Sequence, residues 1–131
     1  TFTTRACTAS EPSPEVARFS GCGPVECKLD KPDAVMPGYK VTTLNADINY
    51  TPASKFANQT NAIGQHYTKF NGTSVAASMT AAAAALLYQK KPDLSPEDMK
   101  GMLKRFCTSI NELKTAQGAG IIDIKKIEES E

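Results

Sequence analysis

The sequence predicts an α/β fold from three observations. Residues 74–89 are rich in alanine and almost free of helix breakers, and alanine has the highest helix propensity. Residues 95–106 combine a helix cap with apolar side chains at helical spacing. Short apolar runs at residues 34–35, 40–44 and 121–124 are bounded by proline or glycine, which is typical of strands. We expect a few mostly parallel strands packed against the alanine-rich helix, with flanking helices at the C-terminus.

The first half of the chain is interrupted by many turn-forming residues. It predicts a loop over residues 11–14, a short strand over 16–19 and a turn over 20–24. The prolines on both sides of Ala34 and Val35 exclude a helix there and favour an extended segment that ends in a turn. Residues 45–65 are polar, and they predict a long surface connection of the kind that often forms a binding loop.

The alanine-rich helix is apolar on nearly every face. Val75, Met79 and Leu86 recur at helical spacing, but the residues between them are almost as apolar. Such a helix is usually buried on all sides, and its small side chains allow a close approach to a sheet. Lysines at 90 and 91 and a proline at 92 predict its end.

The second helix has a well-defined beginning. Ser95 is a favourable N-cap, Pro96 suits the first helical position, and two acidic residues follow in the first turn. One apolar stripe follows, made of Met99, Met102, Leu103 and Phe106. We therefore expect a surface helix with one buried face. After it, residues 121–124 predict a short strand and residues 125–131 a charged terminal helix.

Composition excludes several classes of protein. Hydrophobic residues make up 40% of the 131 residues and charged residues 22%, which is too apolar for a disordered chain. Lys plus Arg number 15 and Asp plus Glu 14, so the net charge of +1 gives no electrostatic case for a nucleic-acid partner. The apolar stretch from Val75 to Tyr88 is too short to span a membrane.

The four cysteines allow three interpretations. Cys22 and Cys27 are near each other in the sequence, whereas Cys7 and Cys107 are far away. This is not the paired spacing of a zinc site. Free and mostly buried thiols, a local disulfide between Cys22 and Cys27, and a metal site remain open, so the cysteines do not decide the cellular compartment.

Residues 70–77 (FNGTSVAA) hold the candidate chemistry. A turn that contains Gly72 brings Ser74 to the start of the apolar helix. The first N–H groups of a helix lack intrahelical partners, and the helix dipole is positive there. Such a position stabilises an oxygen that becomes negative, as the oxyanion formed during attack by a serine nucleophile does. The alternative is an ordinary helix cap, since Ser and Thr favour that position in all helices.

Several segments together resemble the subtilisin-like serine proteases, the subtilases. The matching segments, in the order of that family, are residues 19–24 (FSGCGP), 31–38 (KPDAVMPG), 72–77 (GTSVAA), 92–103 (PDLSPEDMKGML) and 120–123 (GIID). The resemblance covers nearly the whole chain. It implies that residues 1–131 are the C-terminal segment of a subtilase catalytic domain, and therefore an incomplete domain with the C-terminal part of the subtilisin-like fold.

The resemblance also implies roles for the residues around Ser74. Ser74 is expected to be the catalytic nucleophile of a peptide-bond hydrolase that forms an acyl-enzyme. Phe70, Asn71, Gly72 and Thr73 are expected at the edge of the substrate cleft, and loop packing is the alternative for Phe70 and Asn71. The family's catalytic Asp, catalytic His and oxyanion Asn belong to a portion that precedes these residues. We therefore expect the chain alone to be inactive.

Three residues depart from the family pattern. Ser78 stands where the family usually has proline, Met79 where histidine is common, and Met36 where alanine is usual. Each departure concerns local packing and leaves the nucleophile in place. Ser78 and Met79 are consistent with the alternative function, a non-catalytic pseudoprotease or partner-binding module on a subtilase scaffold.

Two other residues were considered as the base that activates Ser74. His66 is the single histidine, but it lies in the polar connection and matches no catalytic-histidine motif. Lys69 as a base requires a buried, neutral lysine, and its polar neighbours do not indicate burial. We expect neither to act as the base.

The resemblance sets the remaining expectations about partners. The expected partners are a peptide or protein substrate and the N-terminal portion of the same protease. Calcium is common in the family, but no acidic cluster dense enough for calcium is evident in the sequence, so we expect no metal ligand here and leave calcium to the complete protein. The sequence does not indicate a location, whereas the resemblance favours a secreted or cell-envelope protein.

Overall fold

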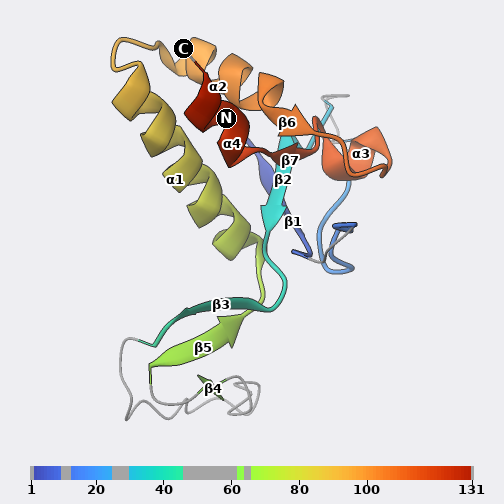
Figure 1. Cartoon of the computed structure of the whole chain (residues 1–131). Helices are drawn as coiled ribbons and strands as arrows, with labels where there is room; N and C mark the ends of the chain where they lie inside the picture. Colours follow the sequence, from blue (N-terminus) through green and yellow to red (C-terminus); the bar gives the residue numbers. More distant parts are fainter. Residues whose placement is uncertain (1, 10–12, 25–29, 46–61, 64–65, 131) are drawn as a thin grey trace.

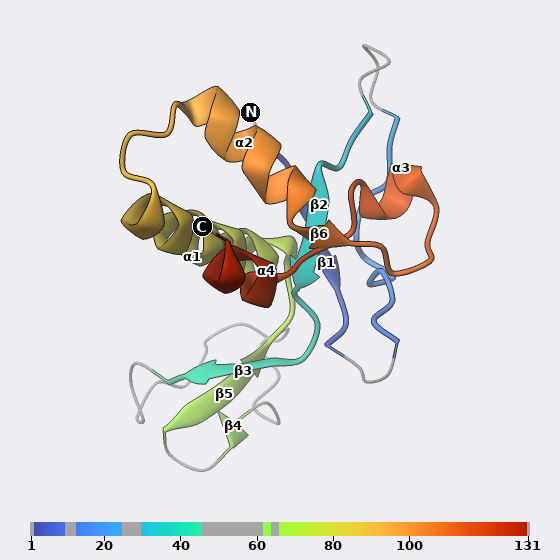
Figure 2. The same cartoon turned by 45° about the horizontal axis from the view of Figure 1, so that its top comes forward.

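The computed structural model describes residues 2–9, 13–24, 30–45, 62–63 and 66–130. In Figures 1 and 2 these residues form an α/β body and a small β-sheet arm that projects from it. The arm leaves the body after the second strand and returns at the start of the longest helix. It therefore lies next to the position of Ser74.

The body is built on a four-stranded sheet with the order β1-β2-β7-β6. Its strands are β1 (Thr4–Cys7), β2 (Ala34–Pro37), β6 (Cys107–Thr108) and β7 (Ile121–Ile122). β1 pairs with β2 and β2 pairs with β7 in parallel, and β6 pairs with β7 antiparallel. The sheet is therefore mostly parallel, as the sequence predicts.

Helix α1 (Thr73–Lys90) packs along β1 and β2, and it confirms the predicted alanine-rich helix. The sequence analysis expected burial on all sides, but within this chain α1 buries one stripe, made of Ala76, Thr80, Ala83 and Leu87. Ala77, Ala81, Ala82 and Ala85 are exposed. The reason is that the sheet, α2 and α4 contact one side of α1, and the described residues cover no more of it.

The other helices are α2 (Pro96–Arg105), α3 (Lys114–Gln117) and α4 (Ile124–Glu129). The predicted cap of α2 is confirmed, because the Ser95 side chain accepts a hydrogen bond from the Asp98 N–H at 3.1 Å. α2 and α4 lie on the same side of the sheet as α1, and α3 lies on the opposite side (Figures 1 and 2). Met99, Leu103, Ile122 and Ile127 join the stripe of α1 in one apolar core.

The arm is an antiparallel sheet with the order β3-β5-β4. It consists of β3 (Val41–Leu44), β4 (Ala62–Ile63) and β5 (Tyr67–Phe70). β3 agrees with the predicted strand at residues 40–44. Most of the predicted connection over residues 45–65 lies outside the described residues.

Several local predictions differ from the structure. Residues 16–19 are not a strand, because Val16 forms an isolated bridge to Cys7 and the chain then turns. The strand predicted over residues 121–124 ends at Ile122, because the Asp123 side chain accepts a hydrogen bond from the Lys125 N–H and caps α4. The sequence analysis did not predict β1 or α3. Among the helices of the described ranges, none has both the length and the apolar character needed to cross a bilayer.

Candidate active site

The first turn of α1 is fixed to the end of β2 by hydrogen bonds through Gly38. The Gly72 N–H donates to the Gly38 carbonyl at 2.8 Å, and the Gly38 N–H donates to the Cys7 carbonyl at 2.9 Å. Cys7 and Pro37 are the last residues of two parallel strands. The start of α1 therefore lies beyond the carboxyl ends of β1 and β2, which is where open α/β sheets bind their ligands.

Gly38 allows this close approach because it has no side chain. A Cβ at this position would lie 2.6 Å from the Gly72 carbonyl oxygen and 2.7 Å from the Ala6 Cβ. It would also lie 3.3 Å from the Ala76 Cβ on α1. The sequence analysis treated residues 31–38 as a family segment and did not predict this packing role. The turn-forming Pro37–Gly38 pair next to a buried strand was the available signal.

Ser74 lies in the first turn of α1 and is exposed. The helix is capped by the backbone of Gly72, with no hydrogen bond from a capping side chain. Among the described residues, neither the Ser74 nor the Thr73 hydroxyl has a hydrogen-bond partner. The alternative interpretation, in which serine or threonine simply caps the helix, is therefore not what the structure shows.

The backbone around Ser74 leaves donors available. Val75 and Ala76 direct their N–H groups to the Gly72 carbonyl at 3.2 and 3.4 Å. Within the described residues, the N–H groups of Thr73 and Ser74 form no backbone hydrogen bond. Unpaired N–H groups at the positive end of an 18-residue helix stabilise negative charge on a nearby oxygen. The hydroxyl and these donors belong to the same turn.

The residues before Ser74 form a fixed turn. The Asn71 Oδ1 accepts a hydrogen bond from the Lys40 N–H at 2.6 Å, which ties the turn to the beginning of the arm. Gly72 is extended, with φ 162°, and a Cβ on it would lie 3.0 Å from the Ser74 Oγ. Phe70 ends β5 with 52% of its surface exposed. The structure thus brings Phe70, Asn71, Gly72 and Thr73 together with Ser74.

His66 and Lys69 do not join this group as bases. His66 precedes β5 at the end of the strand remote from α1, and the strand itself spans about 13 Å. Lys69 is exposed on the strand, whereas a lysine base needs burial to lose its proton. Both observations agree with the expectation from the sequence.

Asp33 is a buried carboxylate that the sequence analysis quoted without a role. Its Oδ2 accepts hydrogen bonds from the Lys31 Nζ at 2.5 Å and the Thr3 N–H at 2.7 Å, and its Oδ1 lies 2.6 Å from the Lys104 Nζ. Burial by itself raises the pKa of Asp33, but the hydrogen bonds from Lys104, Lys31 and Thr3 outweigh burial and lower the pKa. Its backbone carbonyl also accepts from the Ala119 N–H. Asp33 therefore joins β1, β2, α2 and the loop before β7.

The described cysteines are free thiols. Burial raises the pKa of the Cys7 thiol to about 11, and burial likewise raises the pKa of Cys107 to about 11. Cys22 is free and exposed, and Cys27 lies outside the described residues. Within the described parts of the chain, no three His, Cys, Asp or Glu residues are grouped so as to hold a metal ion.

Sequence comparison identifies the family. Residues 3–120 match the profile of the Subtilase family. The chain belongs to this family. It is 35% identical over 97 residues to the serine protease AprX of Bacillus subtilis, and 33% identical over 106 residues to the subtilisin-like protease SBT2.5 of Arabidopsis thaliana. These alignments cover 74% and 76% of the chain, but 21% and 12% of the two relatives.

Solved structures confirm that this subtilase chain has the family's α/β fold. Fervidolysin from Fervidobacterium pennivorans superposes with a TM-score of 0.74 at 21% identity, over 99% of the chain and 19% of fervidolysin. MycP1 from the ESX-1 type VII secretion system superposes with a TM-score of 0.70 at 25% identity, over 99% of the chain and 30% of MycP1. The chain therefore spans less than a third of either protein.

Proposed function

We propose that this chain supplies the nucleophile of a serine endopeptidase, with Ser74 as the residue that forms the acyl-enzyme. The Ser74 hydroxyl attacks the carbonyl carbon of a peptide bond, and the carbonyl oxygen becomes an oxyanion. The backbone N–H of Ser74 helps to bind that oxyanion, and the tetrahedral intermediate then expels the amine. Phe70, Asn71, Gly72 and Thr73 form the edge of the cleft that holds the peptide.

One observation supports this proposal most directly. Ser74 is exposed at the start of α1, its hydroxyl has no partner among the described residues, and the turn that holds it is tied to the end of β2 through Gly38. A serine that served as a cap would donate or accept a hydrogen bond within its own turn. The free hydroxyl next to unpaired N–H groups is instead suited to acyl transfer.

The chain requires further groups to complete the mechanism. A serine hydroxyl is a weak nucleophile until a neighbouring base accepts its proton, and neither His66 nor Lys69 is placed to do so. We propose that the N-terminal portion of the same protease supplies the Asp, the His and the oxyanion Asn, and that residues 1–131 alone are inactive. Calcium binding, if it occurs, is a property of the complete protein. We also propose a secreted or envelope location, because MycP1 is described as part of a secretion system.

Hydrolysis of an unfolded protein tests the proposal. The complete protein is expected to cleave casein, and Ser74→Ala is expected to reduce the rate by at least about 10³-fold. Ser78→Ala is the matched control, because Ser78 is an exposed serine one turn later whose hydroxyl donates to the Ser74 carbonyl at 3.0 Å. It is expected to retain the activity. A complete, folded protein that binds casein without cleaving it is a pseudoprotease, and this result would refute the endopeptidase.

A further inference from the structure

The arm carries two apolar side chains that the fold leaves uncovered. Leu44 and Tyr67 are direct cross-strand partners between β3 and β5. Leu44 is 72% exposed and Tyr67 is 48% exposed. Single exposed apolar residues are common on protein surfaces, but here a leucine and an aromatic ring lie side by side. Because both side chains are exposed, they contribute little to the stability of the fold.

The strand register places a lysine on the same face. Thr42 pairs with Lys69 two residues along from the Leu44–Tyr67 pair, and residues two apart on a strand point to the same side. We call these four residues, Thr42, Leu44, Tyr67 and Lys69, the Leu44–Tyr67 face. All four are exposed. The face therefore combines the apolar Leu44–Tyr67 pair with a neighbouring pair made of a cation, Lys69, and a small threonine, Thr42.

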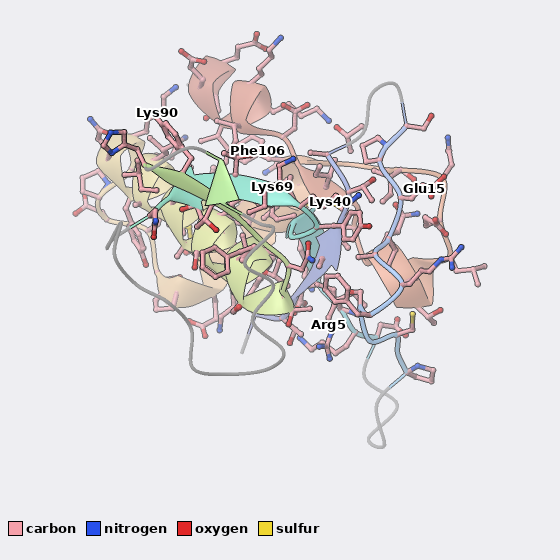
Figure 3. The ribbon with its side chains drawn as sticks, turned by 90° about the horizontal axis from the view of Figure 1, so that it is seen from below. Arg5, Glu15, Lys40, Lys69, Lys90 and Phe106 are labelled. Carbon is pink, nitrogen blue, oxygen red and sulfur yellow. The ribbon has the colours of Figure 1, made fainter. Side chains whose placement is uncertain are left out.

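The arm is positively charged in a chain that is otherwise balanced. Its described residues include Lys40 and Lys69 but no aspartate or glutamate, while the whole chain has a net charge of +1. Lys40 lies 5.2 Å from the centroid of the Tyr39 ring, and neither lysine forms an ion pair within the described ranges. Lys69 lies on β5, and Lys40 immediately precedes β3; both are labelled in Figure 3. The complementary partner is therefore acidic.

The arm also has a free strand edge, and its sheet is directly connected to the candidate active site. β3 is the outer strand of the order β3-β5-β4, so one of its edges has no partner strand among the described residues. β5 leads directly through Phe70 into the turn of Ser74. An extended peptide can add to such an edge as a further strand, with its alternate side chains over one face. Ser74 lies seven positions after Tyr67, which corresponds to at most about 23 Å of extended chain.

We propose that the Leu44–Tyr67 face and the free edge of β3 bind an extended, acidic segment of the polypeptide substrate, away from the bond that Ser74 attacks. This proposal rests on the proposed function, because it assigns a second contact to the same substrate. The apolar side chains of the segment cover Leu44 and Tyr67, and its carboxylates pair with Lys69 across Thr42. Polypeptides whose extended segments carry apolar and acidic side chains on one face are therefore the preferred class of substrate.

Peptide binding tests this proposal independently of catalysis. The probe is a fluorescent peptide of about eight residues in which leucine and glutamate take turns at every second position, with serine between them, so that both kinds of side chain lie on one face of the extended peptide. Its anisotropy is measured with the complete protein carrying Ser74→Ala. Binding is expected, and Lys69→Glu and Leu44→Ser are each expected to weaken it by tenfold or more. Raising the salt concentration is expected to weaken it as well.

Two matched controls make the result specific. Lys125 is an exposed lysine of α4, and Leu113 is a leucine with 76% of its surface exposed in another part of the chain. Lys125→Glu and Leu113→Ser are expected to leave binding unchanged. Equal weakening by the controls, no binding of the peptide, or equal binding of a peptide in which lysine replaces each glutamate would each overturn the proposal.

Cleavage kinetics then separate this proposal from the proposed function. The complete protein is given a short peptide substrate, with and without the acidic extension. Lys69→Glu is expected to lower kcat/KM about tenfold for the extended substrate and to leave it unchanged for the short one. If neither peptide is cleaved but the acidic probe still binds through Lys69, the endopeptidase is refuted and the binding surface stands. If the acidic extension does not raise kcat/KM, or if Lys69→Glu does not remove that increase, the binding surface is refuted.

Discussion

At the scale of single residues, Asp33 contacts several elements of the body, and no sequence signal predicted these contacts. Its carboxylate is 5% exposed and is bound by Lys31, Lys104 and the Thr3 N–H. Removing one partner of a buried, hydrogen-bonded charge leaves the others unsatisfied, which costs more than the pair contributes. The Lys104 side chain is 47% exposed, so water solvates its ammonium group and reduces the loss of stability when its carboxylate partner is removed.

Substitution of Asp33 tests its role in stability. Asp33→Asn is expected to lower the free energy of unfolding at neutral pH by about 1–3 kcal/mol. Because the folded state lowers the pKa of Asp33, its contribution is complete above the unfolded pKa of about 3.9 and is lost as pH falls through the lower folded pKa. Urea unfolding of both proteins between about pH 2 and pH 7 measures this. The difference is expected to shrink below about pH 4, and a difference that is the same at all pH values would contradict the account.

Gly72 governs the position of the nucleophile. Gly72 is extended, so alanine is conformationally allowed, but the new Cβ would lie 3.0 Å from the Ser74 Oγ. The hydroxyl must then shift, and small misplacements of a reacting group are costly. Gly72→Ala is expected to slow the reaction of the Ser74 hydroxyl by tenfold or more in the complete protein, as measured by the rate at which a fluorophosphonate phosphonylates it.

Gly101→Ala is the control for this substitution. Gly101 lies in α2 with no atom within 4 Å of a new Cβ, so alanine is expected to preserve labelling and to raise helix stability by about 1 kcal/mol. A Gly72→Ala protein that is labelled as fast as the Gly101→Ala protein would show that the turn does not position Ser74.

At the scale of elements, the sequence predicted both long helices and the buried face of α2, but not the partial burial of α1. The alanine run and the cap at Ser95 are local signals, and both helices form where these signals place them. Burial of α1 depends on what lies around it, and within this chain Ala81 and Ala82 stay exposed. β1 and α3 were not predicted because strands and helices of four residues are set by their neighbours rather than by local propensity.

The contribution of the α2 N-cap to the free energy of unfolding can be measured by a single substitution. The Ser95 Oγ accepts from the Asp98 N–H and donates to the Asp98 Oδ2 at 2.6 Å. Ser95→Ala is expected to lower the free energy of unfolding by about 1 kcal/mol, whereas Ser95→Asp keeps an acceptor for the N–H and is expected to restore part of that loss. Thermal unfolding of the three proteins measures this. Equal stability of the alanine and serine forms would show that the cap is not needed.

At the scale of the whole molecule, the chain has the fold of its family but covers a minor part of its relatives. The proposed function explains the exposed side of α1 and the lack of a base for Ser74 in the same way, because it assigns both to the N-terminal portion of the protease. Sequence motifs predicted the family, the fold and Ser74 as the candidate nucleophile. They did not predict the packing of Gly38, the network of Asp33 or the Leu44–Tyr67 face, because each of these depends on contacts between residues distant in the sequence.

The attachment site of a fluorophosphonate tests the central claim most directly. The reagent phosphonylates activated serines with loss of fluoride, and mass spectrometry of the digested protein locates the adduct. In the complete protein we expect the adduct on Ser74, and we expect none on residues 1–131 alone. An adduct on another serine, or equally fast labelling of Ser74 in residues 1–131 alone, would contradict the account.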